Sequence, residues 1–572
     1  MRHHQRLVRP LAAFIVVGGA AALESPIVGP RALGMGGANV AATDNTAAQF
    51  YNPAVFGFFG RDAPVVEAAR PVEPAVESDP AADGAALGPT SDPAAGASSA
   101  SPIEPAPTPA RPTTPVPSPT APLPNSEPVA PVSAVPAGAE PAAVASPQRD
   151  RDNNDVGRKN WGFTPIDLLV GVRSHGDAAR SVQLAADVEF DDLASGLGGE
   201  DPIEGLVAVG TVVGNIDDPG TAIMAWANAG VAVRVGRVGV GVRTFAQASG
   251  RVESVDRDNL GLPAPPGQTF AQAVNATGSA SDGDVILLTD PALLAALGGD
   301  TAALERLDFA ARQQGISADD AAGLSETLIL MSQQHGDDTL ADNATSALVH
   351  GLSVSELPIT YGHPFGDRLA VGGSIKLLVG RVYGGNERVF DNLADDEDDG
   401  VDLDEQYQQS ITATIDLAVM VRLPMLNLGL TGRNLTAPRF DGPTADGIAF
   451  PAVRLDPQAT FGVAFIPFRT VVLEVDCDLT RTRSLLPGYR SQVLSAGVEF
   501  DLLRFLALRA GGYRNIAESE PGPVVTAGIG LNVWAMRIDI AAAAALETIT
   551  LEEGEDELPQ EAQVSLGLAI DF

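Results

Sequence analysis

The chain has 572 residues, a net charge of −37 and a pI near 4.3. So acidic a surface repels a phosphate backbone, which excludes nucleic acid as a partner. Cys477 is the single cysteine, so the sequence excludes an intramolecular disulfide and any cysteine-rich zinc or iron–sulfur site. Apolar residues make up 45% of the chain, enough for a large buried or lipid-facing surface.

Residues 1–22 have the pattern of a secretory signal peptide. Arginines near the start precede an apolar run from Leu11 to Leu23, which is too short to cross a bilayer as a helix. The small residues Ala20–Ala22 provide a cleavage site before Leu23. We therefore expect export; the alternative is a buried N-terminal helix. Because no longer apolar run follows, a membrane location would require a β-barrel.

The remaining sequence divides into three parts. Residues 23–61 are rich in glycine and alanine, and we expect them to form a periplasmic or plug-like segment. Residues 62–156 are rich in proline and alanine and bury too little surface to fold, so they read as a disordered linker. Residues 157–572 alternate as strands do, except for a helical insertion at about 286–348, where Asp290 and Ser317 precede helical segments as N-caps.

Apolar and polar residues alternate along the predicted strands with a period of two. Leu473 and Val475, for example, alternate with Glu474 and Asp476. A strand directs successive side chains to opposite faces, so charges at mid-strand on one face and aliphatic residues on the other are typical of a membrane barrel with a polar lumen. The charged residues expected to face this lumen are Asp416, Arg433, Glu474, Asp476, Arg509 and Asp539.

The connections between predicted strands alternate between tight and long. Gly236-Arg237 and Trp534-Ala535 are tight turns, whereas 384–407 and 437–457 are long loops. Outer-membrane barrels have short periplasmic turns and long outer loops, and a β-sandwich has no reason to sort its loops in this way. The sequence therefore predicts an all-β fold, an antiparallel transmembrane β-barrel of about 14 strands.

The last strand ends the chain on an aromatic residue. Val564, Leu566, Leu568, Ile570 and Phe572 share one face. Gly567, Ile570 and Phe572 resemble the C-terminal signal that the outer-membrane assembly machinery reads, although Leu566 departs from the polar residue often found in its place. The alternative interpretation is an ordinary terminal strand.

A glycine-rich motif follows the signal peptide. It runs from Gly29 to Ala41 around Gly34-Met35-Gly36-Gly37, and a second element, Phe50-Tyr51-Asn52-Pro53-Ala54, follows it. It fits neither a P-loop nor a dinucleotide fingerprint. Together the two elements resemble the start of the FadL/PorV-like outer-membrane barrel superfamily. The C-terminal half is most similar to TraF-type conjugal transfer barrels, on strings such as 473–480, 486–490, 496–501 and 508–514.

This resemblance implies an N-terminal segment that enters or closes the barrel from the periplasmic side. Its motif residues are Gly34, Met35, Gly36, Gly37, Asn52, Pro53 and Ala54. FadL relatives pass hydrophobic molecules, PorV relatives serve secretion, and TraF-type members carry a conjugation label. The resemblance covers residues 29–54 and roughly 350–572, and the linker falls outside it.

An acidic cluster between Asp391 and Glu405 is the one metal-site candidate. Asp395, Glu397 and Asp399 have the spacing of the first ligands of a calcium loop, but position twelve is Gln406 and flanking helices are absent. A solvated acidic loop is the other interpretation. We expect no further cofactor.

No catalytic site is expected, because no histidine has metal spacing and no nucleophile elbow occurs. The sequence predicts a bacterial outer-membrane barrel that supports transport or secretion. Its expected partners are membrane lipid, the assembly machinery and components of secretion or conjugation. The alternatives are a barrel scaffold without permeation and an exported soluble β-protein or enzyme.

Overall fold

The computed structural model describes residues 26–60, 160–187, 193, 196–197, 202–216, 221–263, 265–318, 320–336, 339–388, 406–445, 447–503, 505–550 and 557–572. The predicted signal peptide at 1–22 and linker at 62–156 lie outside the described residues. So do Asp395, Glu397 and Asp399 of the predicted calcium loop.

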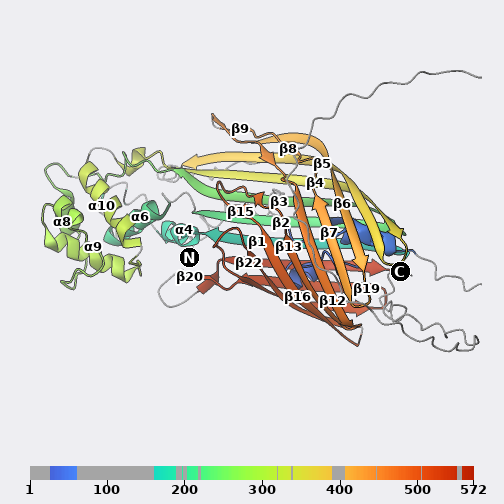
Figure 1. The fold of residues 1–572 in the computed structure, drawn as a ribbon. Coiled ribbons are helices and arrows are strands. Elements are labelled where there is room, and N and C mark those ends of the chain that lie inside the picture. Colours follow the sequence, from blue (N-terminus) through green and yellow to red (C-terminus); the bar gives the residue numbers. More distant parts are fainter. Residues whose placement is uncertain are drawn as a thin grey trace, which may run out of the picture. The chain divides into compact units, whose positions relative to one another are not determined.

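Fourteen of the described strands form one closed antiparallel barrel, which confirms the predicted fold class (Figure 1). The barrel closes where the first and last strands pair, from Gly162 against Asp571 to Arg173 against Glu561. Its strands, in order around the wall, are β1 (Trp161–His175), β2 (Ala222–Val235), β3 (Val238–Ser254), β4 (Ser346–Phe365), β5 (Leu369–Arg388), β6 (Tyr407–Arg422), β7 (Leu426–Arg433), β12 (Gln458–Phe468), β13 (Val471–Asp478), β16 (Val493–Leu502), β17 (Leu506–Asn515), β18 (Val524–Val533), β19 (Met536–Ala545) and β22 (Glu561–Asp571).

The wall is apolar outside and polar inside. On β13, Leu473 and Val475 are 42% and 49% exposed, whereas Glu474 and Asp476, which alternate with them, are almost fully buried. A water-soluble barrel would reverse this order, because burial of aliphatic groups is what stabilises a soluble fold. The outer surface therefore suits a hydrocarbon environment and the interior suits polar groups.

Tight and long connections lie at opposite ends of the barrel. One end, the turn end, carries the tight turns, such as those between β2 and β3 and between β18 and β19. The other end, the loop end, carries the longer connections. These include short two-stranded ribbons made by β8 (Arg439–Phe440) with β11 (Val453–Arg454), β9 (Thr444–Ala445) with β10 (Ile448–Ala449), β14 (Thr482–Arg483) with β15 (Arg490–Ser491), and β20 (Thr548–Thr550) with β21 (Glu557–Pro559).

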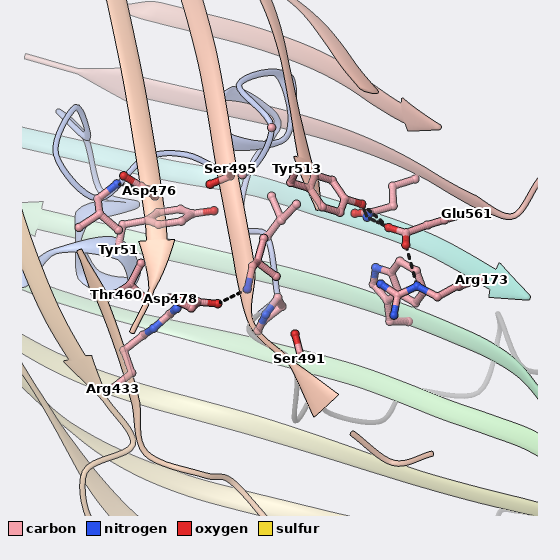
Figure 2. A pocket seen from close by; sticks show the side chains of 18 of the residues that line it. Tyr51, Arg173, Arg433, Thr460, Asp476, Asp478, Ser491, Ser495, Tyr513 and Glu561 are labelled. Atoms are coloured by element: carbon pink, nitrogen blue, oxygen red, sulfur yellow. Dashed lines mark hydrogen bonds and ion pairs between the residues drawn. The ribbon is translucent and has the colours of Figure 1, made fainter. Parts of the chain in front are cut away.

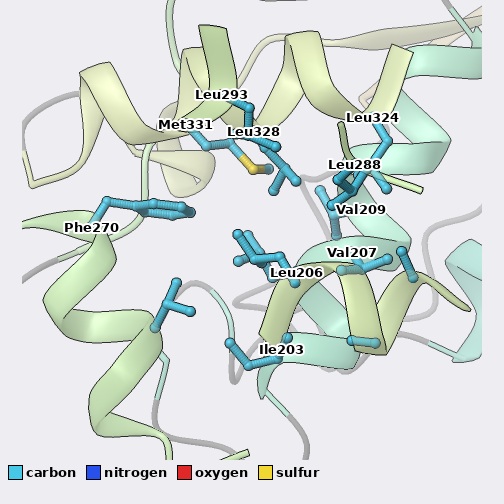
Figure 3. Packing of buried hydrophobic residues seen from close by; sticks show 14 of the residues in the cluster. Ile203, Leu206, Val207, Val209, Phe270, Leu288, Leu293, Leu324, Leu328 and Met331 are labelled. Atoms are coloured by element: carbon cyan, nitrogen blue, oxygen red, sulfur yellow. The ribbon is translucent and has the colours of Figure 1, made fainter. Parts of the chain in front are cut away.

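The helical part is wider than the predicted insertion at 286–348. Helices occur both between β1 and β2 and between β3 and β4, and apolar side chains from both groups contribute to one shared core (Figure 3). They are α4 (Ala178–Asp187), α6 (Pro202–Ile216), α7 (Phe270–Ala276), α8 (Pro291–Ala296), α9 (Thr301–Gln313), α10 (Asp320–Gln334) and the 3₁₀ turn η3 (Leu340–Asp342).

Helix α6 shows why the sequence pattern missed the first group. Its residues from Leu206 to Val213 are all buried, so it has no polar stripe and no helical period to detect. The predicted N-caps of the second group are present: Asp290 accepts a hydrogen bond from the Ala292 N–H, and Ser317 Oγ accepts one from the Asp320 N–H at 3.1 Å. Among the described residues, no helix is long and apolar enough to cross a membrane.

Asp308 on α9 binds the backbone of the loop that precedes α8 through hydrogen bonds. Its carboxylate accepts hydrogen bonds from the backbone N–H groups of Ile286, Leu287 and Leu288 at 3.1, 2.7 and 2.7 Å, and from Arg312 Nε at 2.7 Å. Burial alone would raise the pKa of Asp308, but these hydrogen bonds outweigh it and hold the pKa below its ordinary value. The buried carboxylate therefore stays ionised at neutral pH.

Candidate functional site

Residues 26–60 form a plug inside the barrel. It contains α2 (Pro30–Gly34), α3 (Ala48–Tyr51) and the 3₁₀ helix η1 (Pro53–Phe58), and nearly all of its side chains are buried. Helix α2 packs against β17, β18, β19 and β22, whereas η1 packs against β4, β5 and β6. The plug, blue in Figure 1, therefore touches opposite parts of the wall.

Glycines on both sides let the plug backbone lie directly on the wall. Gly36 has a positive φ of 69°, and a Cβ at this position would overlap the backbone oxygen of Gly512. A Cβ on Gly497 would overlap the carbonyl oxygen of Met35, and one on Gly34 would lie 3.1 Å from the Cα of Gly528. A side chain added at Gly34 or Gly36 of the plug, or at Gly497 opposite Met35, would therefore prevent the contact between plug and wall.

The second motif element fixes the turn that leads into η1. Asn52 Oδ1 accepts a hydrogen bond from the Ala54 N–H at 3.1 Å, and Asn52 Nδ2 donates to the carbonyl oxygen of Val40 at 3.0 Å. Pro53 begins η1, where its missing N–H costs nothing. Asn52 therefore ties the two motif elements to each other.

A chain of alternating charges joins the plug to three strands of the wall. Arg31 Nε and Nη2 donate to the two oxygens of Glu499, each at 2.9 Å. Arg509 donates to Glu499 at 2.6 Å and to Asp539 at 2.7 Å, and Arg537 pairs with Asp539 at 2.9 Å. Although burial alone would lower the pKa of Arg31, Glu499 and Asp44 hold it well above its ordinary value, so the plug cation stays charged.

Two carboxylates on β13 hold the plug backbone. Glu474 Oε1 accepts hydrogen bonds from the N–H groups of Ala41 and Ala42 at 2.6 and 2.9 Å. Asp476 Oδ2 accepts from those of Asn39 and Val40 at 2.8 and 2.9 Å. Four backbone N–H groups of the plug, at residues 39–42, therefore find their acceptors on this one strand of the wall.

The other predicted lumen residues also point inward. Asp416 pairs with Lys376 at 2.9 Å and accepts a hydrogen bond from the Asn434 N–H at 2.8 Å. Arg433 donates to Gln458 at 2.8 Å, and its guanidinium lies 4.5 Å from the ring centre of Phe50 in the plug. All six predicted lumen residues are buried in the barrel interior.

The sequence did not identify Arg31 and Glu499 as partners. Glu499 lies on the polar face of its strand, so the period-two pattern could have added it to the lumen residues. Arg31 lies within the quoted motif, but no local pattern reveals a bond to a residue 468 positions away. Arg173 and Glu561, which form an ion pair at 2.6 Å near the loop end, were missed for the same reason.

A cavity of about 100 Å³ remains between the plug and the wall (Figure 2). Glu561 accepts hydrogen bonds from Arg173 at 2.6 Å, from Gln563 at 2.7 Å and from Tyr513. Ile27, Val40, Trp226 and Val493 add apolar surface, and further charge comes from Arg433, Asp476 and Asp478. The cavity is therefore small and lined by charges of both signs.

The C-terminal residues lie at the barrel seam. A Cβ on Gly567 would lie 2.9 Å from the plug residue Pro30, so this glycine makes room for the plug. Ile570 is half-buried on the outer face. Phe572 is exposed, and its backbone exchanges hydrogen bonds with that of Trp161 at 2.8 and 2.9 Å. A role in assembly stays a prediction.

In the described part of the chain, no three histidine, cysteine, aspartate or glutamate side chains are grouped so that they could hold a metal ion.

Comparison with family models finds a match over part of the chain. Residues 269–478 match the family described as "F plasmid transfer operon, TraF, protein", which confirms the resemblance to TraF-type proteins over less than half of the chain. The match includes helices α8–α10 and ends at the last residue of β13, so the plug motif lies outside it. No curated protein matches the chain.

Solved structures with a similar fold include a mutant of the monoaromatic hydrocarbon channel TodX, at 9% identity and a TM-score of 0.35, covering 73% of this chain and 91% of that chain. The toluene transporter TbuX of Ralstonia pickettii is 13% identical, with a TM-score of 0.32 and coverage of 72% and 89%. A FadL homologue of Pseudomonas aeruginosa is 8% identical, with a TM-score of 0.33 and coverage of 73% and 91%. This chain is thus similar to a TraF-type family at residues 269–478. The evidence for a closed barrel is the pairing of the chain's own strands.

Proposed function

We propose that the chain is an outer-membrane barrel that supports transport or secretion across the outer membrane, with the plug as its gate. The observation that carries this proposal is a set of polar contacts between plug and wall, which lie beside apolar clusters around the plug residues Leu33 and Phe56. Arg31, Glu474, Asp476 and Glu499 make the polar contacts through ion pairs and hydrogen bonds to backbone N–H groups.

A polar contact suits a gate better than a permanent core. When a plug moves, water replaces its partners, and charged groups in water lose little because they are hydrated again. The apolar clusters around Leu33 and Phe56 would lose their burial free energy on opening, so they favour the seated plug. The lumen residues therefore form a wall that tolerates both a seated plug and a water-filled passage.

Single-channel recording in planar bilayers tests the gate, with Arg31→Met as the opening variant. Loss of a buried ion-pair partner costs about 3 kcal/mol, so open events should rise on the order of a hundredfold if the plug then leaves its seat. Arg454→Met, an exposed position at the loop end, is the control and should leave recordings unchanged. Heat-modifiable gel mobility checks that each variant is folded.

A scaffold without permeation is the second candidate, and the small size of the cavity favours it. Three cavities beside the plug measure about 100, 40 and 20 Å³, which favours a closed barrel while the plug is seated. If Arg31→Met is folded and stays electrically silent, the gate proposal is wrong and the scaffold stands. Its partners would then be components of a secretion or conjugation assembly, found by cross-linking in cells.

The comparisons suggest one class of cargo. TodX is a monoaromatic hydrocarbon channel, and TbuX is a toluene transporter. In this chain, Arg173, Arg433 and Glu561 make the cavity beside the plug charged, which favours a polar solute at that point of the lumen. Liposome swelling with charged and neutral solutes of equal size would separate a polar cargo from an apolar one. Faster entry of an uncharged apolar solute would contradict the preference for a polar solute.

Outer-membrane localisation and the absence of catalysis belong to the same proposal. Apolar residues face outward on every side of the closed wall, and this surface requires lipid or detergent. Fractionation of cells should therefore place the protein with outer-membrane markers. Release into the soluble fraction without detergent would instead support an exported soluble β-protein.

A further inference from the structure

Large apolar side chains are exposed around the turn end of the barrel. Trp534 is 98% exposed, Leu503 85% and Phe468 70%. Phe365, Phe505 and Phe572 are each more than half exposed at the same end. We call these six residues the collar. Soluble surfaces rarely gather so many apolar groups, so the collar needs a partner that covers it.

Two collar residues hold strained backbone conformations. Leu503 and Trp534 lie in the turns before β17 and before β19, with φ values of +51° and +57°. Bulky residues rarely adopt positive φ, because the side chain crowds the backbone there, and glycine or asparagine would fit without that cost. A strained turn that presents a fully exposed tryptophan indicates that the side chain itself has a use.

Aromatic side chains also touch one another along this end. The ring of Phe572 lies 5.6 Å from that of Trp161 and 6.1 Å from that of Trp534. On β4, His363 packs edge-on against Phe365 at 5.0 Å. Such clusters at strand ends are typical of side chains that lie among lipid headgroups.

Arginines accompany the collar although the chain as a whole is strongly acidic. Arg237 lies in the turn between β2 and β3, Arg368 in that between β4 and β5, and Arg469 in that between β12 and β13. Arg368 and Arg469 are exposed and Arg237 is half-buried, while Asp367 is the acidic neighbour of Arg368. The sequence between β5 and β6, by contrast, is acidic at 391–405.

We propose that the collar and these three arginines form a binding surface for anionic phospholipids in the leaflet at the turn end. The proposal rests on the membrane location proposed above. Guanidinium groups pair with phosphate oxygens, and the collar side chains enter the acyl region beneath them. An anionic headgroup keeps its net charge, whereas choline compensates the phosphate, so phosphatidylglycerol binds more tightly than phosphatidylcholine.

The chain's own tryptophans provide the measurement. With Trp226→Phe, the lumen tryptophan is removed, and Trp161 and Trp534 report from the turn end. Quenching by brominated phosphatidylglycerol, relative to brominated phosphatidylcholine, then gives the relative binding constant at the collar. Each arginine near an anionic surface contributes about fivefold to that preference.

The test compares two triple variants in this background. Arg237→Gln, Arg368→Gln and Arg469→Gln together should abolish the preference for phosphatidylglycerol. Arg439→Gln, Arg454→Gln and Arg481→Gln, three exposed positions at the loop end, should leave it intact. If the triple variant at Arg237, Arg368 and Arg469 fails to fold, Arg368→Gln alone should lower the preference for phosphatidylglycerol about fivefold.

Equal affinity of the Trp226→Phe protein for both lipids would overturn the proposal. A preference for phosphatidylglycerol that survives in the triple variant at Arg237, Arg368 and Arg469 would also overturn it. Competition by millimolar glycerol phosphate would instead show a soluble phosphate site and also contradict lipid binding. These outcomes are distinct from failure of the proposed function. In that case the protein would not enter either bilayer, and bromolipids of both kinds would leave its fluorescence unquenched.

Discussion

At Gly36 the plug backbone runs against the wall with no room for a side chain. Its φ is +69°, and an added Cβ would overlap the backbone of Gly512. Gly267 provides a matched comparison, because its φ is +84° and no atom lies within 4 Å of an added Cβ. The two glycines share the same conformational freedom, and only Gly36 also needs the space.

We therefore expect Gly36→Ala to weaken plug seating much more than Gly267→Ala affects the fold. Strain at positive φ costs about 1 kcal/mol in both variants, and the steric overlap adds about 1–3 kcal/mol for Gly36→Ala alone. Limited proteolysis of the folded protein measures the difference, because a displaced plug becomes a substrate. Equal protection of the two variants would show that the plug does not need this close contact.

Among the elements, the helices at the loop end depend on Asp308. Asp308→Ala would leave the N–H groups of Ile286, Leu287 and the buried Leu288 without this acceptor, a loss of about 1–3 kcal/mol. Asp282→Asn removes only the exposed pair with Arg312 and serves as the control. Hydrogen exchange of α8 and α9 in the full chain should speed up in the first variant and stay unchanged in the second.

The same carboxylate gives the helices a pH dependence. The pKa of Asp308 is held below its ordinary value in the folded state, so its contribution is complete above the unfolded pKa of about 4. That contribution is lost as the pH falls through the lower, folded pKa. Far-UV circular dichroism should show the wild-type helices losing stability below about pH 4. Asp308→Asn, which does not titrate, should lose less, and parallel curves would contradict this assignment.

For the molecule as a whole, the closing of the barrel brings together Gly60 and Asn160, the described residues on either side of the predicted linker. A Cβ on Gly60 would lie 3.3 Å from Asn160 Oδ1 and 3.3 Å from Gly236 Cα in the turn between β2 and β3. Gly60, the last described residue of the plug, therefore lies beside Asn160, the residue before β1.

Deletion of residues 62–156 should therefore leave the barrel and its plug folded. The four residues that remain between Gly60 and Asn160 can bridge such neighbours, since each extended residue spans about 3.3 Å. Heat-modifiable mobility and the proteolytic protection of the plug should match those of the full chain. A barrel that fails to form would show that the linker contributes to folding, whereas loss of transport alone would point to a separate role.

The sequence by itself determined the strand architecture. Alternation with a period of two places Glu474 and Asp476 inside and Leu473 and Val475 outside, because neighbouring side chains on a strand must point to opposite faces. The tight turns then order the strands, since antiparallel neighbours joined by a few residues have little choice of partner. These are local relations, and a sequence displays local relations directly.

Only the tertiary structure decided what fills the barrel. The bidentate pair of Arg31 with Glu499, the seat of Gly36 on Gly512 and the shared core of α6 with α10 join residues far apart in the chain. Ring closure brings these residues together, and no periodic pattern encodes which of them will meet. The buried helix α6 escaped detection for a related reason, because a helix covered on all sides loses the polar stripe that would reveal it.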